Sequence, residues 1–348
     1  MASLNSEYRK RFLQRQLLFE QRYRDIFDRI ADQFSRLAVD PNARFTKAFR
    51  FPPVLVKKMD GIITDMHGEV LAVTEDEIAR MWDLSNQKND RLVAEYLRTI
   101  SEIKASQSAA YYMSNTPALK AFLSAKHGTD TLSKMVWKIA GQFRAEMEVH
   151  LGLGIVNGDS AQKISQRIRQ YLQNPDALFR RVRDASGKLV PSQRMRDYHP
   201  GQGVYRSAYK NAMRVARSET NMAYHSADNM RWSQIDFVKG IKISLSASHP
   251  HYNFLEICEE LAGVYPKDFQ WTNWHPNCLC NATPILTSHT NFREYLKTGQ
   301  REVNNYVTEY PESFKGYIKN NYERLSNYKS VPYWMQNNME IIGKYVNV

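Results

Sequence analysis

The sequence predicts a mostly α-helical protein: a long N-terminal helical region followed by a small α+β domain of one helix and a short sheet. Three observations favour this fold class. Apolar residues recur at helical spacing over the first 150 residues, alanine-rich helical sequence returns after residue 204, and alternating apolar residues follow it directly. The 348 residues exceed the roughly 250–300 that one hydrophobic core usually supports. We therefore expect three parts, a helical region, a compact domain and a tail, at 1–151, 152–286 and 287–348.

Composition limits the class of protein. Hydrophobic residues make up 43% of the chain and charged residues 24%, which is typical of a globular protein. No apolar run approaches the ~20 residues of a membrane-spanning helix, so we expect no membrane segment. The first residues are polar and lack the apolar stretch of a secretory signal, which indicates a cytoplasmic protein. In such a reducing compartment, three cysteines favour free thiols or metal ligands over disulfides.

The first forty residues predict one long helix that ends at Asp40 and Pro41. Its apolar residues recur at spacings of three, four or seven: Phe12, Phe19, Tyr23, Ile26, Ile30, Phe34 and Leu37. So long a stripe predicts a partner helix, which we expect from the same chain, with oligomerisation through this helix as the alternative. Thr131 is expected to be the N-cap of a later helix. The further helices predicted in this region lie at 52–70, 86–104, 117–125 and 131–151.

Around Gly152 the sequence G-L-G-I-V-N-G-D-S predicts a turn, and we place a domain boundary there. Asp159 or Ser160 would cap the helix that follows, at 161–172. Residues 176–203 then predict an exposed basic excursion or hairpin, because this stretch contains Ser-Gly and Pro-Gly turn signals.

A strong helix is predicted from 204 to about 235, with alanines on the face that packs. One or two strands are expected within 236–246, turning at Lys239 and Gly240. The tyrosine-rich tail predicts helical pieces at 291–298, 301–306 and 313–327. Its aromatic residues favour packing against the helical half over stacking on nucleic-acid bases.

The formal net charge of the chain is +12, and most of it is concentrated between Lys163 and Arg217. This segment contains thirteen basic residues and only three acidic ones. Such a field attracts polyanions, and each neutralised phosphate releases a counterion, so one interpretation is DNA binding that ignores base sequence. The alternative is a solvated basic face, or one that meets an acidic protein. The residues assigned to a nucleic-acid interface are Lys163, Arg167, Arg169, Arg180, Arg181, Arg183, Lys188, Arg194 and Arg196.

All three cysteines lie close to one histidine near the start of the tail. The candidate metal ligands are Cys258, His275, Cys278 and Cys280. Two cysteines at i and i+2 would point to the same face of a strand, and the four residues would complete a Cys₃His zinc set. Leu255 stands where a C-x-x-C motif would have its other cysteine, and His249 and His251 are alternative ligands. The other interpretation is that reduced cysteines pack as small hydrophobes while His275 caps a loop.

Three segments follow one another along the chain: R-S-E-T-N-M-A-Y, then C-E-E-L-A-G-V-Y-P, then W-H-P-N-C-L-C. Over 152–286 they resemble the phage Mu protein F-like family of head morphogenesis, or minor capsid, proteins. Two departures stand out, because Leu255 and Leu279 replace a cysteine and an arginine of the family pattern. The residues that match the pattern are Arg217, Glu219, Cys258, Leu261, Gly263, His275, Pro276, Cys278 and Cys280.

The resemblance implies a structural protein of a phage or prophage, not an enzyme, that associates with the portal, capsid proteins and packaged DNA. It implies a place in the bacterial cytoplasm during assembly and in the virion head afterwards. Arg217 and Glu219 do not share a helix face, so we expect two buried polar residues, each with its own partner. The alternative is a zinc-dependent nucleic-acid enzyme or phage-delivered effector centred on His275 and its neighbouring cysteines. Apart from zinc, no cofactor is expected.

Overall fold

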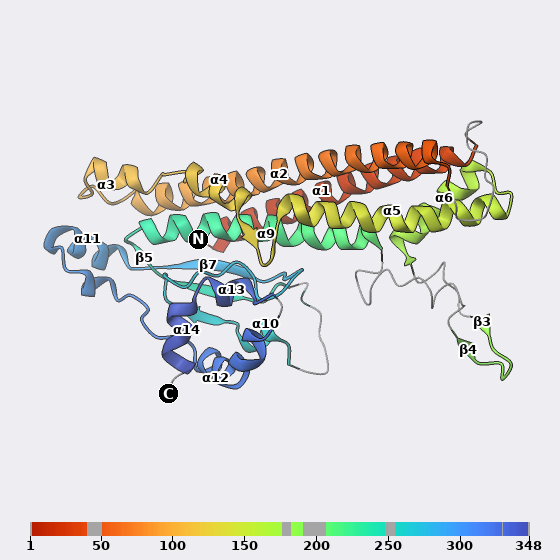
Figure 1. Cartoon of the computed structure of the whole chain (residues 1–348). Helices are drawn as coiled ribbons and strands as arrows, with labels where there is room; N and C mark the ends of the chain where they lie inside the picture. Colours follow the sequence, from red (N-terminus) through yellow and green to blue (C-terminus); the bar gives the residue numbers. More distant parts are fainter. Residues whose placement is uncertain are drawn as a thin grey trace. The chain divides into compact units, whose positions relative to one another are not determined.

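The computed structural model describes residues 2–39, 51–175, 182–190, 207–247, 249, 255–328 and 330–346 (Figure 1). The fold is mostly helical with a small α+β part, which confirms the predicted class at that level. The residues group into two compact units. Unit 1 comprises Met1–Arg15, Asp76–Thr129 and Arg217–Val348, and unit 2 comprises Gln16–Glu75 and Asp130–Ala216. Among the described helices, none has the length and apolar character needed to span a bilayer.

In the described part of the N-terminal half, the regular elements are helices and two two-residue strands. Its elements are α1 (Ala2–Arg36), the 3₁₀ turn η1 (Leu37–Val39), α2 (Pro53–Leu97), α3 (Ala105–Ala110), α4 (Thr116–Ser124), β1 (Lys126–His127), β2 (Asp130–Thr131), α5 (Leu132–Val156) and α6 (Ala161–Gln173). The long first helix is therefore confirmed up to residue 39, whereas Asp40 and Pro41 lie outside the described residues. The division into separate helices at 52–70 and 86–104 is wrong, because α2 runs unbroken from Pro53 to Leu97, where it ends before residue 104. No proline interrupts it after its first turn, and proline is the strongest helix breaker.

Helix α5 starts where its cap predicts but continues further. The Thr131 hydroxyl accepts a hydrogen bond from the Lys134 N–H, as expected of an N-cap. The predicted helix end at residue 151 is wrong, since α5 continues through Gly152 and Gly154 to Val156. A Cβ atom on Gly154 would lie 2.4 Å from the Ile164 side chain, so glycine here allows α6 to approach closely. Neither compact unit begins at residue 152.

The predicted turn within 152–160 is confirmed, at Asn157 and Gly158 between α5 and α6. Gly158 has a φ of +66°, a conformation that glycine adopts without strain. Ser160 is the N-cap of α6, and its hydroxyl accepts from the Lys163 N–H. The core of unit 2 contains ring contacts among four residues: Phe27, Phe34, Phe143 and Tyr209.

The second half holds the principal sheet. Its elements are β3 (Val182–Arg183), β4 (Leu189–Val190), α9 (Ala208–Gln234), β5 (Val238–Ser244), α10 (Ile257–Glu260), β6 (Gly263–Tyr265), β7 (Asn281–Leu286), α11 (His289–Thr298), the 3₁₀ turn η3 (Arg301–Asn304), α12 (Glu312–Ser326), α13 (Tyr333–Gln336) and α14 (Met339–Val346). Strand β5 is central, with β6 and β7 antiparallel on either side. Strands β3 and β4 form a separate antiparallel hairpin, in agreement with the predicted one.

The predicted turn at Lys239 and Gly240 is wrong, because both residues lie inside β5. The register of β5 against β7 instead shifts between Val238 and Gly240, which is a β-bulge or a similar irregularity. A Cβ atom on Gly240 would lie 2.6 Å from the Val307 side chain and 3.0 Å from the Tyr265 carbonyl oxygen. The glycine therefore serves close backbone packing and not chain reversal.

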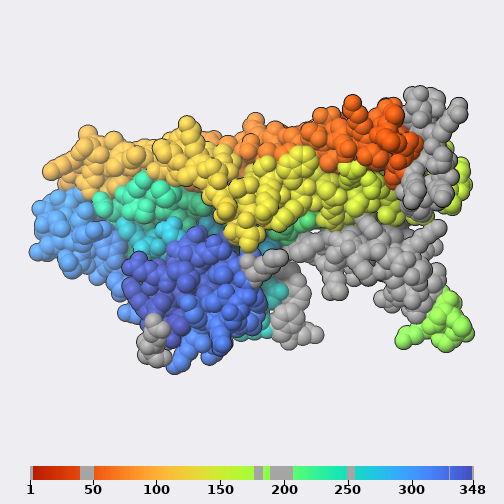
Figure 2. All heavy atoms as spheres, viewed as in Figure 1, coloured from red at the N-terminus to blue at the C-terminus, as the bar shows by residue number. Residues whose placement is uncertain are grey.

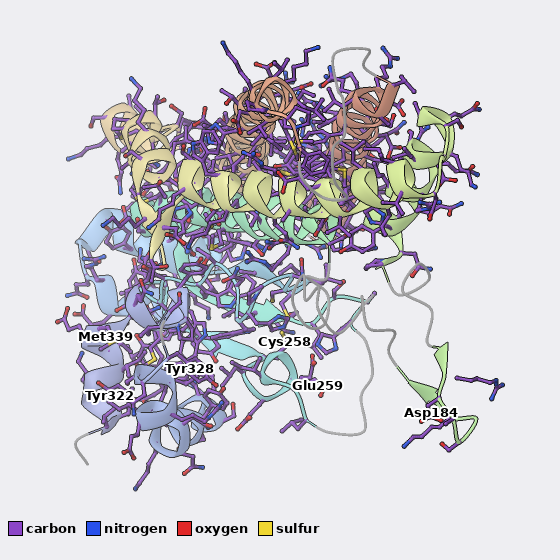
Figure 3. All side chains as sticks on the ribbon, turned by 45° about the vertical axis from the view of Figure 1, so that its right-hand side comes forward. Asp184, Cys258, Glu259, Tyr322, Tyr328 and Met339 are labelled. Atoms are coloured by element: carbon purple, nitrogen blue, oxygen red, sulfur yellow. The ribbon has the colours of Figure 1, made fainter. Side chains whose placement is uncertain are left out.

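The C-terminal tail shares one hydrophobic core with the cysteine-rich segment. Rings of the two parts meet: the Trp274 and Trp334 centroids are 5.4 Å apart, and those of Tyr265 and Phe314 are 5.5 Å apart. This confirms that the tail's aromatic residues pack, although much of their packing is on the cysteine segment. Figure 2 shows the C-terminal residues, in blue, as one continuous surface. Tyr328 keeps 44% of its surface exposed (Figure 3).

Within unit 1, a buried polar network joins α2 to α9. The Lys88 ammonium lies 2.5 Å from one carboxylate oxygen of Asp228. Ser85 and Asn89 donate to the other oxygen, at 2.6 and 2.8 Å, and Trp232 donates to Asn89. Because each buried group has a partner, the network costs far less than an isolated buried charge would.

Candidate metal centre

The fold brings the three cysteines together from two elements. Cys258 lies on α10, whose start is stabilised by the Glu259 carboxylate accepting from the Glu256 N–H at 3.0 Å. Cys278 and Cys280 lie in the loop directly before β7, so the predicted placement of both on one strand is wrong. Glu259 follows Cys258 on the same short helix (Figure 3). The convergence of the thiols therefore comes from loop geometry and not from strand alternation.

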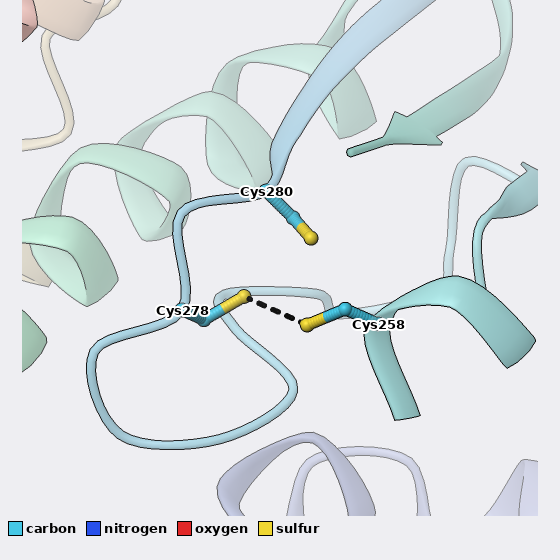
Figure 4. Close-up of side chains that lie close together, drawn as sticks. All are labelled: Cys258, Cys278 and Cys280. Atoms are coloured by element: carbon cyan, nitrogen blue, oxygen red, sulfur yellow. Dashed lines mark hydrogen bonds between the residues drawn. The ribbon is translucent and has the colours of Figure 1, made fainter. Parts of the chain in front are cut away.

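The three sulfur atoms form one compact buried group (Figure 4). All lie within 4.8 Å of one another, and the Cys258 and Cys278 sulfurs are 3.7 Å apart. A disulfide would hold them at about 2.05 Å, so the cysteines are free thiols. Tetrahedral zinc with Zn–S bonds of about 2.3 Å places its sulfur ligands about 3.8 Å apart. The observed spacing fits that geometry.

His275 lies at the edge of this group. Its Nε2 atom is 2.9 Å from the Cys258 sulfur, and its Nδ1 atom is 2.7 Å from the Pro276 carbonyl oxygen. Because Nδ1 can only donate to a carbonyl, Nε2 keeps the lone pair that a metal ion or a thiol proton would use. His275 is not within 4.8 Å of all three sulfurs, so the thiols form the tight set and the imidazole adjoins it.

The alternative ligands that the sequence suggested lie elsewhere. Leu255, in place of a further cysteine, is 67% exposed. His249 lies 3.4 Å from the Glu256 carboxylate and is not part of the thiol group. His251 lies outside the described residues. Among the predicted ligands, the structure thus brings together the three cysteines and His275.

Hydrogen bonds between the thiols shift the pKa values of Cys278 and Cys258 in opposite directions. Hydrogen bonds from Cys258 and Cys280 hold the pKa of Cys278 well below its usual range. The hydrogen bond to Cys278 in turn raises the pKa of Cys258. The cluster therefore favours one thiolate stabilised by its neighbours, and thiolates are the form in which cysteines bind metals.

A guanidinium group lies beside the cysteine loop. Arg9 of α1 donates from Nη2 to the carbonyl oxygen of Leu279, at 2.6 Å. Burial lowers the pKa of Arg9, while the nearby Tyr224, Cys278 and Cys280 act in the opposite direction. Sequence reasoning missed Arg9, because nothing in the local pattern links residues 270 positions apart.

The family-motif helix contacts the same loop. Ser218 lies between Arg217 and Glu219, and its hydroxyl accepts from the Asn277 N–H at 3.3 Å. Glu219 is buried and accepts a hydrogen bond from His127. The expectation that both motif residues are buried is wrong for Arg217, whose side chain is exposed. Two residues apart on a helix, they face different environments, as their spacing requires.

The remaining motif residues are structural. Leu261 is fully buried, and its carbonyl oxygen accepts from the Tyr265 hydroxyl at 2.8 Å. A Cβ atom on Gly263 would lie 2.9 Å from Pro311, so glycine permits the tail to pack there. Pro276 supplies the carbonyl that orients His275.

Part of the predicted basic interface is neutralised within unit 2. Lys163 and Arg167 both lie 2.5 Å from Asp159, and Arg169 lies 3.3 Å from Asp32. The hydrogen bonds from Lys163 and Arg167 lower the pKa of Asp159. These acids precede the segment in which the positive charge is concentrated, so the sequence count overstated the local field.

Two of the other predicted basic residues lie in the β3–β4 hairpin. Arg183 and Lys188 are exposed, and Arg183 donates to the Gly187 carbonyl oxygen at 2.7 Å. Asp184 organises the turn by accepting from two backbone N–H groups (Figure 3). The residues of the predicted interface that lie outside the described part of the chain are Arg180, Arg181, Arg194 and Arg196.

Chemically, the cluster offers three soft sulfur donors and one imidazole nitrogen. This donor set suits zinc, which binds thiolates and imidazoles in tetrahedral sites. The neighbouring Ser218–Asn277 hydrogen bond ties the cysteine loop to α9. Comparisons of the chain with protein-family models, with curated proteins and with solved structures found no match.

Proposed function

We propose that this chain is a non-enzymatic minor head protein of a phage or prophage, similar to the Mu F-like family, that associates with portal, capsid proteins and DNA during head morphogenesis. The observation that supports it is the convergence of the three family-like segments in unit 1. The Asn277 N–H donates to Ser218, which joins the last segment to the first across 59 positions. Cys258, from the middle segment, lies 3.7 Å from Cys278 of the last. The three family-like segments are far apart in the sequence, and these two contacts bring them together in unit 1.

The genes beside that of this chain provide the most direct test of the assignment. A portal or terminase gene next to it would support the proposal. A neighbourhood without phage structural genes, together with absence of the protein from DNA-filled heads, would contradict it.

The cysteine cluster supports a structural zinc site as part of this proposal. Cys258, Cys278 and Cys280 would hold the ion, with His275 as the fourth ligand. Bound zinc would supply a crosslink between α10 and the loop before β7, which lie on either side of β6 in the chain. A catalytic zinc keeps an open position for water, whereas these three sulfurs are buried. We therefore favour the structural role over the zinc-dependent nucleic-acid enzyme.

We predict that the purified full chain contains one zinc ion, measured by elemental analysis. Cys280→Ser removes one ligand, and altered metal sites typically lose a factor of about 10–100 or more in affinity, so the variant should lose most of its zinc on dialysis. His249→Ala is the matched control, because His249 lies nearby but outside the thiol group. A well-folded wild-type protein without stoichiometric zinc would sink the metal site and leave the head-protein assignment standing.

DNA binding is the second testable part of the proposal. We predict weak, sequence-independent binding whose affinity falls with salt, with a slope of about 0.9 per neutralised phosphate. Neutralising Arg183 together with Arg180, Arg181, Arg194 and Arg196 should flatten that slope. Titrations of labelled duplexes at several salt concentrations measure it.

The matched control neutralises Lys163, Arg167 and Arg169. These three side chains pair with Asp159 and Asp32, so their removal should change the salt slope less than removal of the five arginines. An equal decrease of the salt slope in the two variants would show that Lys163, Arg167 and Arg169 contact DNA despite their ion pairs. Retained affinity in the five-arginine variant would refute the role given to that segment.

A further inference from the structure

The contacts that hold the first turns of α1 against the rest of unit 1 include an apolar cluster and a polar contact to the cysteine loop. The apolar cluster consists of Leu4, Tyr8, Phe12, Met81, Leu84, Leu92 and Tyr224. The polar contact is the hydrogen bond of 2.6 Å from Arg9 to the carbonyl oxygen of Leu279. Leu279 stands between two of the three clustered cysteines. The start of α1 is therefore bonded to the backbone of the candidate metal loop itself.

We propose that Arg9 is a positioning residue of the metal centre, through which a bound metal ion fastens the first turns of α1 to unit 1. This inference rests on the proposed zinc site. A metal held by Cys278 and Cys280 fixes both neighbours of Leu279, and so fixes the carbonyl that Arg9 needs. Without the ion, the packing of the loop and its hydrogen bond from Asn277 to Ser218 hold that carbonyl, and the two metal–sulfur bonds on either side of it are lost.

Charge favours the same coupling. Zinc with three thiolates and a neutral imidazole carries a net charge of −1, and the Arg9 guanidinium carries +1 at every accessible pH. Opposite charges attract more strongly where the surroundings exclude water. Arg9 thus balances the charge of the loaded site as well as donating to its backbone.

Arg9 has a second contact that does not depend on the metal. Its guanidinium lies 5.1 Å from the Phe12 ring centroid, a contact within α1 itself. A purely structural role in the helix would use this contact and leave metal binding unaffected. The two roles therefore differ in whether replacing Arg9 changes the affinity for zinc.

Arg11 provides a matched control on the same helix. It donates to Gln87 of α2 at 3.0 Å and lies 4.6 Å from the Tyr8 ring centroid. Arg11 therefore also binds α1 to unit 1 with a guanidinium group, but not through the cysteine loop. Replacing it removes a similar charge and a similar surface contact.

The experiment measures zinc affinity by chelator competition in the full-length wild type and in Arg9→Ala, Arg9→Lys and Arg11→Ala. Residues that support metal ligands from outside typically contribute a factor of about 10–100 in metal affinity. We expect roughly a tenfold loss in Arg9→Ala, partial recovery in Arg9→Lys, and no significant change in Arg11→Ala.

Hydrogen exchange of the wild type with and without zinc measures the reciprocal effect. Coupling between two sites acts equally in both directions, so zinc removal should speed exchange at residues 2–15 about tenfold. Residues 16–36 of the same helix belong to unit 2 and should change little. This measurement needs no variant and stands even where Arg9→Ala fails to fold.

The outcomes separate the two proposals. Wild-type protein that binds no zinc overturns the metal centre and this inference together. Zinc that binds Arg9→Ala as tightly as wild type, or zinc removal that leaves residues 2–15 unchanged, overturns the role of Arg9 alone.

Discussion

Glu219 is a buried carboxylate whose partner comes from a distant part of unit 1. His127 donates to it, and although burial disfavours a charged imidazole, the hydrogen bond and charge of Glu219 raise the pKa of His127. The folded state therefore binds the His127 proton more tightly than the unfolded state does. The stabilisation is fully present below the unfolded pKa of about 6.5 and is lost as pH rises through the raised folded pKa.

We predict that the free energy of unfolding falls as pH rises above about 6.5, because the folded state then loses the proton that it binds more tightly than the unfolded state does. Urea titrations across pH 5.5–8.5 measure it. The free energy of unfolding of His127→Gln should depend less steeply on pH than that of the wild type. Glu146 would still make it fall with rising pH in the variant, since burial raises the pKa of that carboxyl to about 8. Parallel curves for wild type and variant would show that His127 does not titrate in this way.

At the scale of elements, two glycines of α5 predict opposite effects. Gly154 lies against Ile164 of α6, so a Cβ atom there meets side-chain carbons at 2.4 Å. Gly141 has no heavy atom within 4 Å of the position of such a Cβ. We predict that Gly154→Ala destabilises the protein by roughly 1–2 kcal/mol through overpacking, net of the gain in helix propensity. Thermal unfolding of unit 2 measures the change.

Gly141→Ala serves as the control in the same helix. Because alanine is favoured over glycine in an exposed helix by roughly 0.8–1 kcal/mol, this variant should be slightly more stable than wild type. Destabilisation of similar size by both substitutions would mean that packing against α6 is not what glycine provides at residue 154.

The start of a helix could be predicted where the side chain of a single residue caps it. Thr131 and Ser160 each cap a helix through a hydrogen bond to the N–H three residues on, a rule that depends on neighbouring residues alone. The glycine at 240 misled the prediction, because it serves close packing against another element and does not reverse the chain. Helix α2 was divided wrongly for a similar reason, since weak local signals do not end a helix that packs along its length.

At the scale of the whole molecule, the two units draw on distant parts of the chain. Helices α1, α2 and α9 each contribute residues to both units. The sequence divided the chain into consecutive parts, because composition changes only along the chain. Lys88 illustrates the limit: its charge predicts a surface position, yet it is buried 2.5 Å from Asp228. The partner of Lys88 becomes evident only from the packing of α2 against α9, which brings Asp228 beside it.

By itself the sequence determined the mostly helical class, the capped helix starts and the candidate ligands Cys258, His275, Cys278 and Cys280. These depend on periodicity, on residue chemistry and on contacts between near neighbours. The tertiary structure decided which predicted charges are neutralised, that Arg217 is exposed while Glu219 is buried, and that Arg9 reaches the cysteine loop. Contacts between residues so far apart are set by how the elements pack, and the local pattern of a sequence does not contain that information.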